Sequence, residues 1–140
     1  MNYSYANAKD LNAIASLLKE CNLPSNDLTE HLIHFIVAKE KDRLIGCIGL
    51  ELEGPLLRSL AVDAGHRGRG IARELCARLL AHARQEGARE IYLLTNTAAN
   101  FFDSEGFQRK DRQEAPEVIA KHKQFTELCP SSAVLMWKPL

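Results

Sequence analysis

The order of strand and helix patterns along the chain predicts an α/β fold of the three-layer α+β kind. Its mixed central sheet has a parallel βαβ core and helices on both faces. An apolar run at 56–62 precedes a helical pattern over 70–86, and a second apolar run follows at 91–95. Such a strand–helix–strand unit places its two strands parallel. Two earlier strand-like runs are separated only by Lys41-Asp42-Arg43, which is typical of an antiparallel hairpin.

The remaining segments supply the outer strands and helices of this fold. Asp10 can cap a helix that runs to about Cys21, because apolar residues recur there with helical period. Asn22 and Pro24 end that helix, and Gly87 ends the helix at 70–86. The other expected elements are a strand at 2–6, a short helix from about Thr29, strands at 35–40 and 44–51, a helix at 96–105, a strand after Gly106-Phe107, a helix at 115–128 and a final strand at 133–138.

Length and charge indicate one domain over residues 1–140. A chain of 140 residues can bury a single core. Its 18 basic and 18 acidic residues balance, so net charge gives no reason to expect nucleic acid or a membrane surface as a partner. The N-terminus MNYSYANAKD lacks the basic-then-apolar order of a signal peptide, and no apolar run is long enough to span a bilayer. We therefore expect a cytoplasmic protein.

The cysteines and histidines do not predict a metal site. The four cysteines lie far apart without zinc-site spacing, at Cys21, Cys47, Cys76 and Cys129. Cys47 and Cys76 fall in apolar patterns and are expected in the core. Cys129 is expected to be the most accessible, and a covalent route through it is not expected. His31 and His34 have metal-like spacing, but no third ligand is in register, so structural or solvated roles are expected.

The stretch 56–72, read LLRSLAVDAGHRGRGIA, combines the features of a phosphate-binding loop. An apolar strand leads into a glycine-rich turn, and a helix then begins, whose first N–H groups lack intrahelical partners. Glycines let the backbone approach a ligand closely, while Arg67 and Arg69 add positive charge. No Lys-Ser/Thr pair follows the glycines as in a P-loop, and position 73 is Arg where a dinucleotide fingerprint needs Gly.

The spacing that fits is Arg-x-x-Gly-x-Ala, from Arg67 through Gly70 to Ala72. With the preceding Leu60-Ala61-Val62 strand, it resembles the pyrophosphate-binding motif of the GNAT superfamily of acetyl-CoA-dependent acyltransferases. The resemblance covers nearly the whole chain and implies a GNAT-type sheet with acetyl-CoA (coenzyme A) as cofactor. In that family the strand pairs with the pantetheine arm, and the loop and helix start hold the pyrophosphate. The implied cofactor-binding residues here are Leu60, Ala61, Val62, His66, Arg67, Gly68, Arg69, Gly70, Ile71 and Ala72.

A second segment, NFFDSEGF at 100–107, resembles the N-x-x-A-x-x-FYEK-x-GF helix of the same family. The resemblance implies that Asn100 contacts the pantetheine region and that residue 102 lies beside the thioester sulfur. The usual general acid there is a tyrosine, whereas this chain has Phe102, which cannot protonate a departing thiolate. Water, Tyr92 or Ser59 could replace it. Core packing is the other interpretation of Phe102.

Charged residues in two strands are candidates for the acceptor site. Glu51 and Glu53 are the candidate catalytic bases. They alternate with Leu52, so both are expected on one face, which is either the substrate cleft or solvent. Arg58 interrupts an apolar strand, where an unpaired charge would be costly. We expect Arg58, with the adjacent Ser59, to bind a substrate carboxylate or another oxyanion. A structural ion pair with Glu51 or Glu53 is the alternative.

The C-terminal half gives a finer resemblance. The elements LLTNTAANFF and CPSSAVLMWKPL, together with LLRSLAV and HRGRG, are similar to the small GNAT proteins associated with arsenic-resistance operons. They are also similar to the acetyltransferase domain of N-acetylglutamate synthases. Both comparisons imply direct N-acetyltransfer to a small-molecule amine or amino-acid-like acceptor. The long polar segment 22–30 is expected to be a lid over the acceptor site.

Two other functions stay open at this point. A non-catalytic acyl-CoA-binding or sensor module would agree with the loss of the tyrosine at Phe102. A nucleic-acid-binding domain that uses the RGRG segment is disfavoured by the neutral charge and by the lack of interleaved aromatic residues. Dimers are common in the resembled family, and no segment here decides the oligomeric state, so a homodimer is left open.

Overall fold

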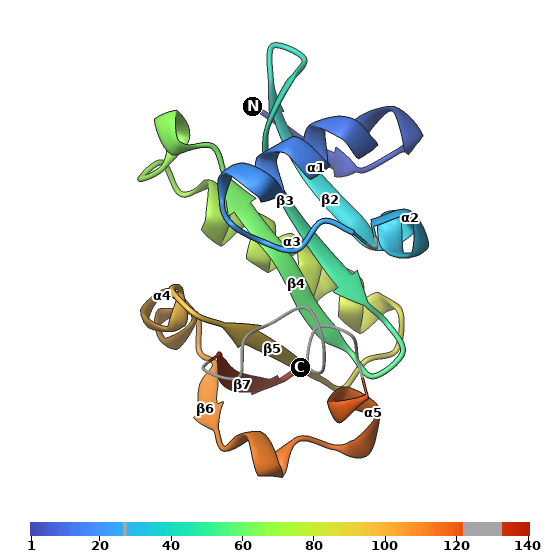
Figure 1. The fold of residues 1–140 in the computed structure, drawn as a ribbon, viewed down its shortest axis with the longest axis vertical. Coiled ribbons are helices and arrows are strands. Elements are labelled where there is room, and N and C mark those ends of the chain that lie inside the picture. The colour runs from blue at the N-terminus through green and yellow to red at the C-terminus, as the bar shows by residue number, and fades with distance from the viewer. Residues whose placement is uncertain (27, 122–132) are drawn as a thin grey trace.

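A computed structural model describes residues 1–26, 28–121 and 133–140 and shows a seven-stranded sheet with helices on both faces (Figure 1). The strands are β1 (Asn2–Tyr5), β2 (Phe35–Glu40), β3 (Arg43–Glu51), β4 (Leu56–Val62), β5 (Glu90–Thr95), β6 (Gln108–Lys110) and β7 (Val134–Pro139). The α-helices are α1 (Leu11–Glu20), α2 (Leu28–His31), α3 (Ile71–Gln85), α4 (Ala99–Ser104) and α5 (Glu117–Ala120).

The strand order β1-β2-β3-β4-β5-β7-β6 confirms the mixed sheet with a parallel βαβ core. Strands β4 and β5 are parallel and are joined by α3, whereas every other neighbouring pair among the described strands is antiparallel. The hairpin between β2 and β3 is also confirmed. Its two-residue turn, Lys41-Asp42, has φ values of 52° and 65°. Positive φ at both positions is the type I′ geometry that suits the right-handed twist of paired strands.

Several helix boundaries differ from the sequence expectation, for local reasons. Helix α3 begins at Ile71 because Gly70, at φ 80°, is its N-cap. Helix α4 begins at Ala99, three residues later than expected. The expected helix at 115–128 begins only after Pro116, which is the N-cap of α5 and has extended backbone (ψ 153°). Its continuation past residue 121 lies outside the described residues, as do Cys129 and its neighbours.

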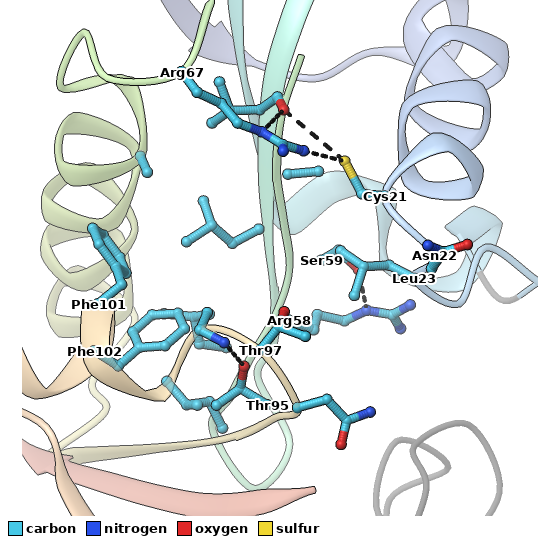
Figure 2. A pocket seen from close by; sticks show the side chains of 18 of the residues that line it. Cys21, Asn22, Leu23, Arg58, Ser59, Arg67, Thr95, Thr97, Phe101 and Phe102 are labelled. Carbon is cyan, nitrogen blue, oxygen red and sulfur yellow. Dashed lines mark hydrogen bonds between the residues drawn. The ribbon is translucent and has the colours of Figure 1, made fainter. Parts of the chain in front are cut away.

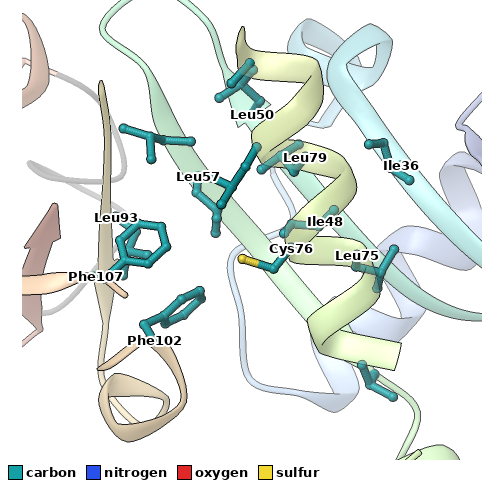
Figure 3. Close-up of a cluster of buried hydrophobic side chains, with 14 of the residues drawn as sticks. Ile36, Ile48, Leu50, Leu57, Leu75, Cys76, Leu79, Leu93, Phe102 and Phe107 are labelled. Atoms are coloured by element: carbon teal, nitrogen blue, oxygen red, sulfur yellow. The ribbon is translucent and has the colours of Figure 1, made fainter. Parts of the chain in front are cut away.

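The buried residues of the described chain form three clusters, and the two largest lie on opposite faces of the sheet. Helix α3 buries Leu75, Cys76 and Leu79 against the sheet, and Phe102 and Phe107 extend the same cluster (Figure 3). Helix α1 buries Ile14, Leu17 and Leu18 on the opposite face, where they meet Phe35, Val37 and Cys47. Cys47 and Cys76 are thus core residues as predicted, and burial raises the pKa of each thiol to about 12.

Gly49 is required by the packing of Phe35. Phe35 is fully buried, and its ring lies 5.9 Å below the guanidinium carbon of Arg58. A Cβ at Gly49 would come within 2.5 Å of two atoms of that ring, a distance that ordinary packing does not allow. The glycine in β3 therefore leaves room for the ring beneath the buried arginine.

We expect Gly49→Ala to lower the free energy of unfolding by about 1–3 kcal/mol, because the ring must leave its rotamer well or the strand must shift. Urea denaturation measures this. Gly65→Ala is the matched control, since its Cβ would lie 3.4 Å from the nearest atom, Asp63 Oδ2, which is an ordinary contact. Equal stability of the two variants would contradict the packing argument.

Candidate functional site

A cleft opens where β4 and β5 separate. The two strands pair only at Leu56–Tyr92 and Leu57–Leu93. Beyond that point β5 continues in register with β7 through Thr95, while β4 continues beside β3 to Val62. The space between the parted strands is a cavity of about 1120 Å³, lined by Arg58 to Val62 of β4 and by Leu94 and Thr95 of β5. A cavity of this size can hold an extended ligand.

A β-bulge at Ser59 shapes the β4 wall of this cleft. Gly49 pairs with Arg58 but Cys47 pairs with Ala61, so two β4 residues lie opposite Ile48 alone. Ser59 takes the left-handed backbone conformation, with φ 59°. Its carbonyl oxygen accepts a hydrogen bond from the Cys47 thiol at 3.3 Å. A bulge of this kind turns side chains away from strict alternation, and strained backbone in a cleft is a common feature of functional sites.

The glycine-rich loop and the start of α3 form the end of the cleft next to Val62. Gly68 and Gly70 have φ values of 79° and 80°, which residues with a side chain rarely adopt. A Cβ at either position would meet no atom within 4 Å, so the space above both glycines is open. Gly70, Ile71 and Ala72 line the cavity. The first N–H groups of a 15-residue helix therefore face open space, the arrangement that binds phosphate oxygens.

The two arginines of this loop have different positions. Arg67 lines the cavity, and its Nε donates to the Val62 carbonyl oxygen at 3.1 Å (Figure 2). Arg69 instead forms a two-contact pair with Glu40, at 3.2 and 3.4 Å, and this hydrogen-bonded guanidinium lowers the pKa of the Glu40 carboxyl. His66 lines the cavity and contacts Asp63 at 2.8 Å and Glu40 at 3.0 Å.

Of the residues expected at the acceptor site, Arg58, Glu51 and Ser59 lie together, whereas Glu53 does not join them. Arg58 and Glu51 are both almost fully buried, and Arg58 Nη1 lies 3.6 Å from Glu51 Oε2. Arg58 also lines the cleft and donates from Nε to Ser59 Oγ at 3.0 Å. Glu53 is exposed in the β3–β4 turn. The expectation that Glu51 and Glu53 share a strand face is wrong, because β3 ends at Glu51 and the turn through Gly54 breaks the alternation.

The two α4 residues that the resemblance implies at the cofactor differ in position, because Phe102 is buried in the core and Asn100 is exposed. Phe102 is 3% exposed and contacts the rings of Phe101 and Phe107, with centroids 5.1 and 5.4 Å away. It still forms part of the cavity wall. Asn100 lies on the outer side of α4, where its Oδ1 accepts a hydrogen bond from Arg109 at 3.2 Å. Tyr92 is buried with Leu56, Ile119 and Leu135.

Two further groups of residues line the cleft. Asn22, Leu23 and Pro24 of the first group belong to the segment 22–30 that was expected at the acceptor site, whereas Cys21 and the second group were not predicted. Cys21, Asn22, Leu23 and Pro24 follow α1 and form the wall opposite α4 (Figure 2). The Cys21 sulfur accepts a contact from Arg67 Nη2 at 3.6 Å. The second group is Thr95, the last residue of β5, with Asn96 and Thr97 after it. The second group could have been predicted from the order of the elements, because ligands in open α/β sheets bind beyond the carboxyl ends of the strands. Among the described helices, none is both long and apolar enough to cross a membrane.

Comparison with known proteins agrees with this geometry. Residues 7–107 match the acetyltransferase (GNAT) family. An uncharacterized N-acetyltransferase of Chlorobaculum tepidum is 32% identical over 96 residues, or 66% of this chain and 61% of that protein. Human N-acetyltransferase 8B is 34% identical over 87 residues, or 54% of this chain and 38% of its own length. The chain thus spans less than two thirds of these relatives.

Several solved structures share the fold. The N-acetylglutamate synthase of Neisseria gonorrhoeae, complexed with coenzyme A and N-acetyl-glutamate, superposes with a TM-score of 0.85 at 23% identity over 99% of this chain and 35% of that chain. The protein Rv2747 of Mycobacterium tuberculosis, in complex with CoA and NLQ, gives a TM-score of 0.84 at 23% identity over 100% of this chain and 99% of that chain.

Proposed function

Because the chain belongs to the acetyltransferase (GNAT) family, we propose that it is an acetyl-CoA-dependent N-acetyltransferase. The acetyl group goes by direct attack to the amine of a small amino-acid-like acceptor. The observation that carries the proposal is one continuous cleft. It joins the glycine-rich start of α3, which suits a pyrophosphate, to the buried cation Arg58, which suits a carboxylate.

The residues present fit coenzyme A. Gly68 and Gly70 leave open the space that a pyrophosphate would need, and Arg67 supplies a charge beside the first turn of α3. Along Leu60 to Val62, the edge of β4 that faces β5 has no paired strand among the described residues. That edge can hydrogen-bond an amide-bearing arm. We assign the backbone N–H groups from His66 to Ala72 to the pyrophosphate end and the edge of Leu60 to Val62 to the pantetheine. The Arg69 side chain is paired with Glu40 and contributes little to binding.

Acetyl-CoA supplies an activated acetyl thioester, and the chain's own residues orient and deprotonate the acceptor. Arg58 carries several N–H donors, so it can hold Glu51 and an acceptor carboxylate at once. Glu51 is the base that we favour, because it is held near the cleft by Arg58, and a water chain would carry the proton to it. Glu53, on the exposed turn, is the second candidate.

Ser59 is the protein group best placed to replace the missing tyrosine. Its Oγ accepts a hydrogen bond from the Arg58 cation, so its own O–H can donate into the cleft. Tyr92 is less suitable, because it is buried on the side of β5 that packs against Leu56. Burial, followed by Glu90 and Glu114, also raises the Tyr92 pKa.

The acceptor class rests on the arginine and on the likeness to N-acetylglutamate synthase. That protein's structure is described with N-acetyl-glutamate, an acetylated amino acid. A buried arginine in the cleft wall agrees with an acceptor that carries a carboxylate. The resemblance to the arsenic-resistance-associated proteins predicts an amino-acid analogue in the same position.

The second candidate function is a non-catalytic acyl-CoA sensor, which Phe102 favours. Thiol release from acetyl-CoA, measured over a panel of amino acids and their analogues, separates the two. An acetyltransferase releases coenzyme A in proportion to the acetylated product found by mass spectrometry. A sensor binds acetyl-CoA in calorimetry but shows no turnover above hydrolysis with any amine.

We expect Arg67→Gln to weaken acetyl-CoA binding about 10-fold or more, because a charged donor facing the ligand contributes about 1.5–3 kcal/mol. Arg69→Gln, its matched control, should change the dissociation constant by less than about 3-fold, since Arg69 is paired with Glu40 and such exposed pairs contribute little. Isothermal titration calorimetry measures both. Equal losses in the two variants would contradict the placement.

We expect the parent enzyme to prefer an amino acid over its carboxamide about 10-fold or more in kcat/KM. Arg58→Lys should remove most of that preference, because a single ammonium cannot match the bidentate fork. Lysine keeps a positive charge opposite Glu51, which guards against unfolding, and circular dichroism checks the fold. An unchanged preference in Arg58→Lys would leave the ion pair with Glu51 as the role of this residue.

We expect Ser59→Ala to lower kcat about 100-fold near neutral pH, within the range for a lost general acid. The defect should shrink as pH rises toward the thiol pKa of about 8.5, where the thiolate leaves without protonation. Ser104→Ala, at the end of α4, is the control. A defect that is the same at every pH would assign Ser59 a structural role instead.

A further inference from the structure

A cluster of two imidazoles and a carboxylate lies at the far end of α3. His82 belongs to α3, and Glu86 follows it by one helical turn at the helix C-cap. His34, from the 3-10 turn that precedes β2, lies with its Nδ1 3.0 Å from His82 Nε2. The ligand atoms of the three side chains all lie within 4.8 Å of one another. From Ile71 to His82 the helix rises about 16 Å, so this cluster is distant from the cofactor end of the cleft.

The distance between the imidazoles suits a shared metal ion. Zinc–nitrogen bonds of about 2.0–2.1 Å in a tetrahedron place two nitrogen ligands about 3.3–3.4 Å apart. The observed 3.0 Å separation therefore needs only a small opening of the pair. Glu86 is exposed, so a change of side-chain rotamer can bring its carboxylate closer.

The second ring nitrogen of His82 makes a hydrogen bond of the kind that orients metal-bound histidines. Its Nδ1 lies 3.1 Å from the Tyr5 hydroxyl, which comes from β1. With Nε2 on a metal, His82 must carry its proton on Nδ1, and the Tyr5 oxygen can accept that N–H.

We infer that His34, His82 and Glu86 form a zinc-binding site, with Tyr5 holding His82 in the correct tautomer. Imidazole nitrogens favour zinc over magnesium or calcium, which prefer oxygen ligands. The site joins α3 to the turn before β2 and to β1 behind it. A bound ion would therefore hold these elements together and stabilise the fold, at a distance from acetyl transfer.

The test is zinc titration of the full chain, prepared without a histidine tag, against a colorimetric chelator. We expect one zinc ion per chain with micromolar or tighter affinity, and a rise in melting temperature when zinc is added. His34→Ala should weaken binding 10- to 100-fold, and Glu86→Gln about 10-fold. Glu74→Gln is the control, because it removes an exposed carboxylate from the same helix. Both test positions are only partly buried or exposed, so these variants should fold.

Cobalt absorption identifies the ligands. Bands of a tetrahedral nitrogen–oxygen site that vanish in His34→Ala would support the inference. A thiolate-to-cobalt charge-transfer band would place the metal on a cysteine and overturn it. Absence of zinc binding by the parent at 100-micromolar concentrations, about 100 times the weakest affinity expected, would reduce the cluster to a hydrogen-bonded histidine pair.

Discussion

The separation of β4 from β5 after only two paired residues is the constraint on which the candidate site depends. Parallel strands that remained paired to their ends would fill the space between them with ladder hydrogen bonds and side chains. Here β5 pairs along its length with β7, and β4 with β3. Each wall of the cleft is therefore held by its own antiparallel partner, and the cleft can open without loss of the sheet.

In the β4 wall of the cleft, the bulge at Ser59 and the buried Arg58 both lower the stability of the fold relative to a regular apolar strand. A left-handed serine costs on the order of 1–3 kcal/mol, and a buried cation needs partners. Glu51, Ser59 and the Phe35 ring supply contacts to Arg58, and Gly49 leaves room for that ring. This free-energy cost is explained if the function of β4 is to present a cation and a hydroxyl group to a ligand.

The sequence predicts the parts of this structure that depend on neighbouring residues. The hairpin turn expected at Lys41-Asp42-Arg43 and the glycine-rich helix start at Gly70 follow from local backbone preferences. Contacts between distant segments did not follow from the pattern. The pairing of Arg69 with Glu40 and of His34 with His82 depends on how elements pack together. The shared face expected for Glu51 and Glu53 was wrong because strand alternation was extended past the end of β3.

Amide hydrogen–deuterium exchange with and without acetyl-CoA tests the central claim most directly, because the proposed contacts to the cofactor are largely from backbone N–H groups. We expect slower exchange at Leu60 to Val62 and at Gly68 to Arg73 when acetyl-CoA is present. We expect little change at the other end of α3, near His82. Unchanged exchange in both of the first segments under saturating acetyl-CoA would contradict the assignment of this cleft.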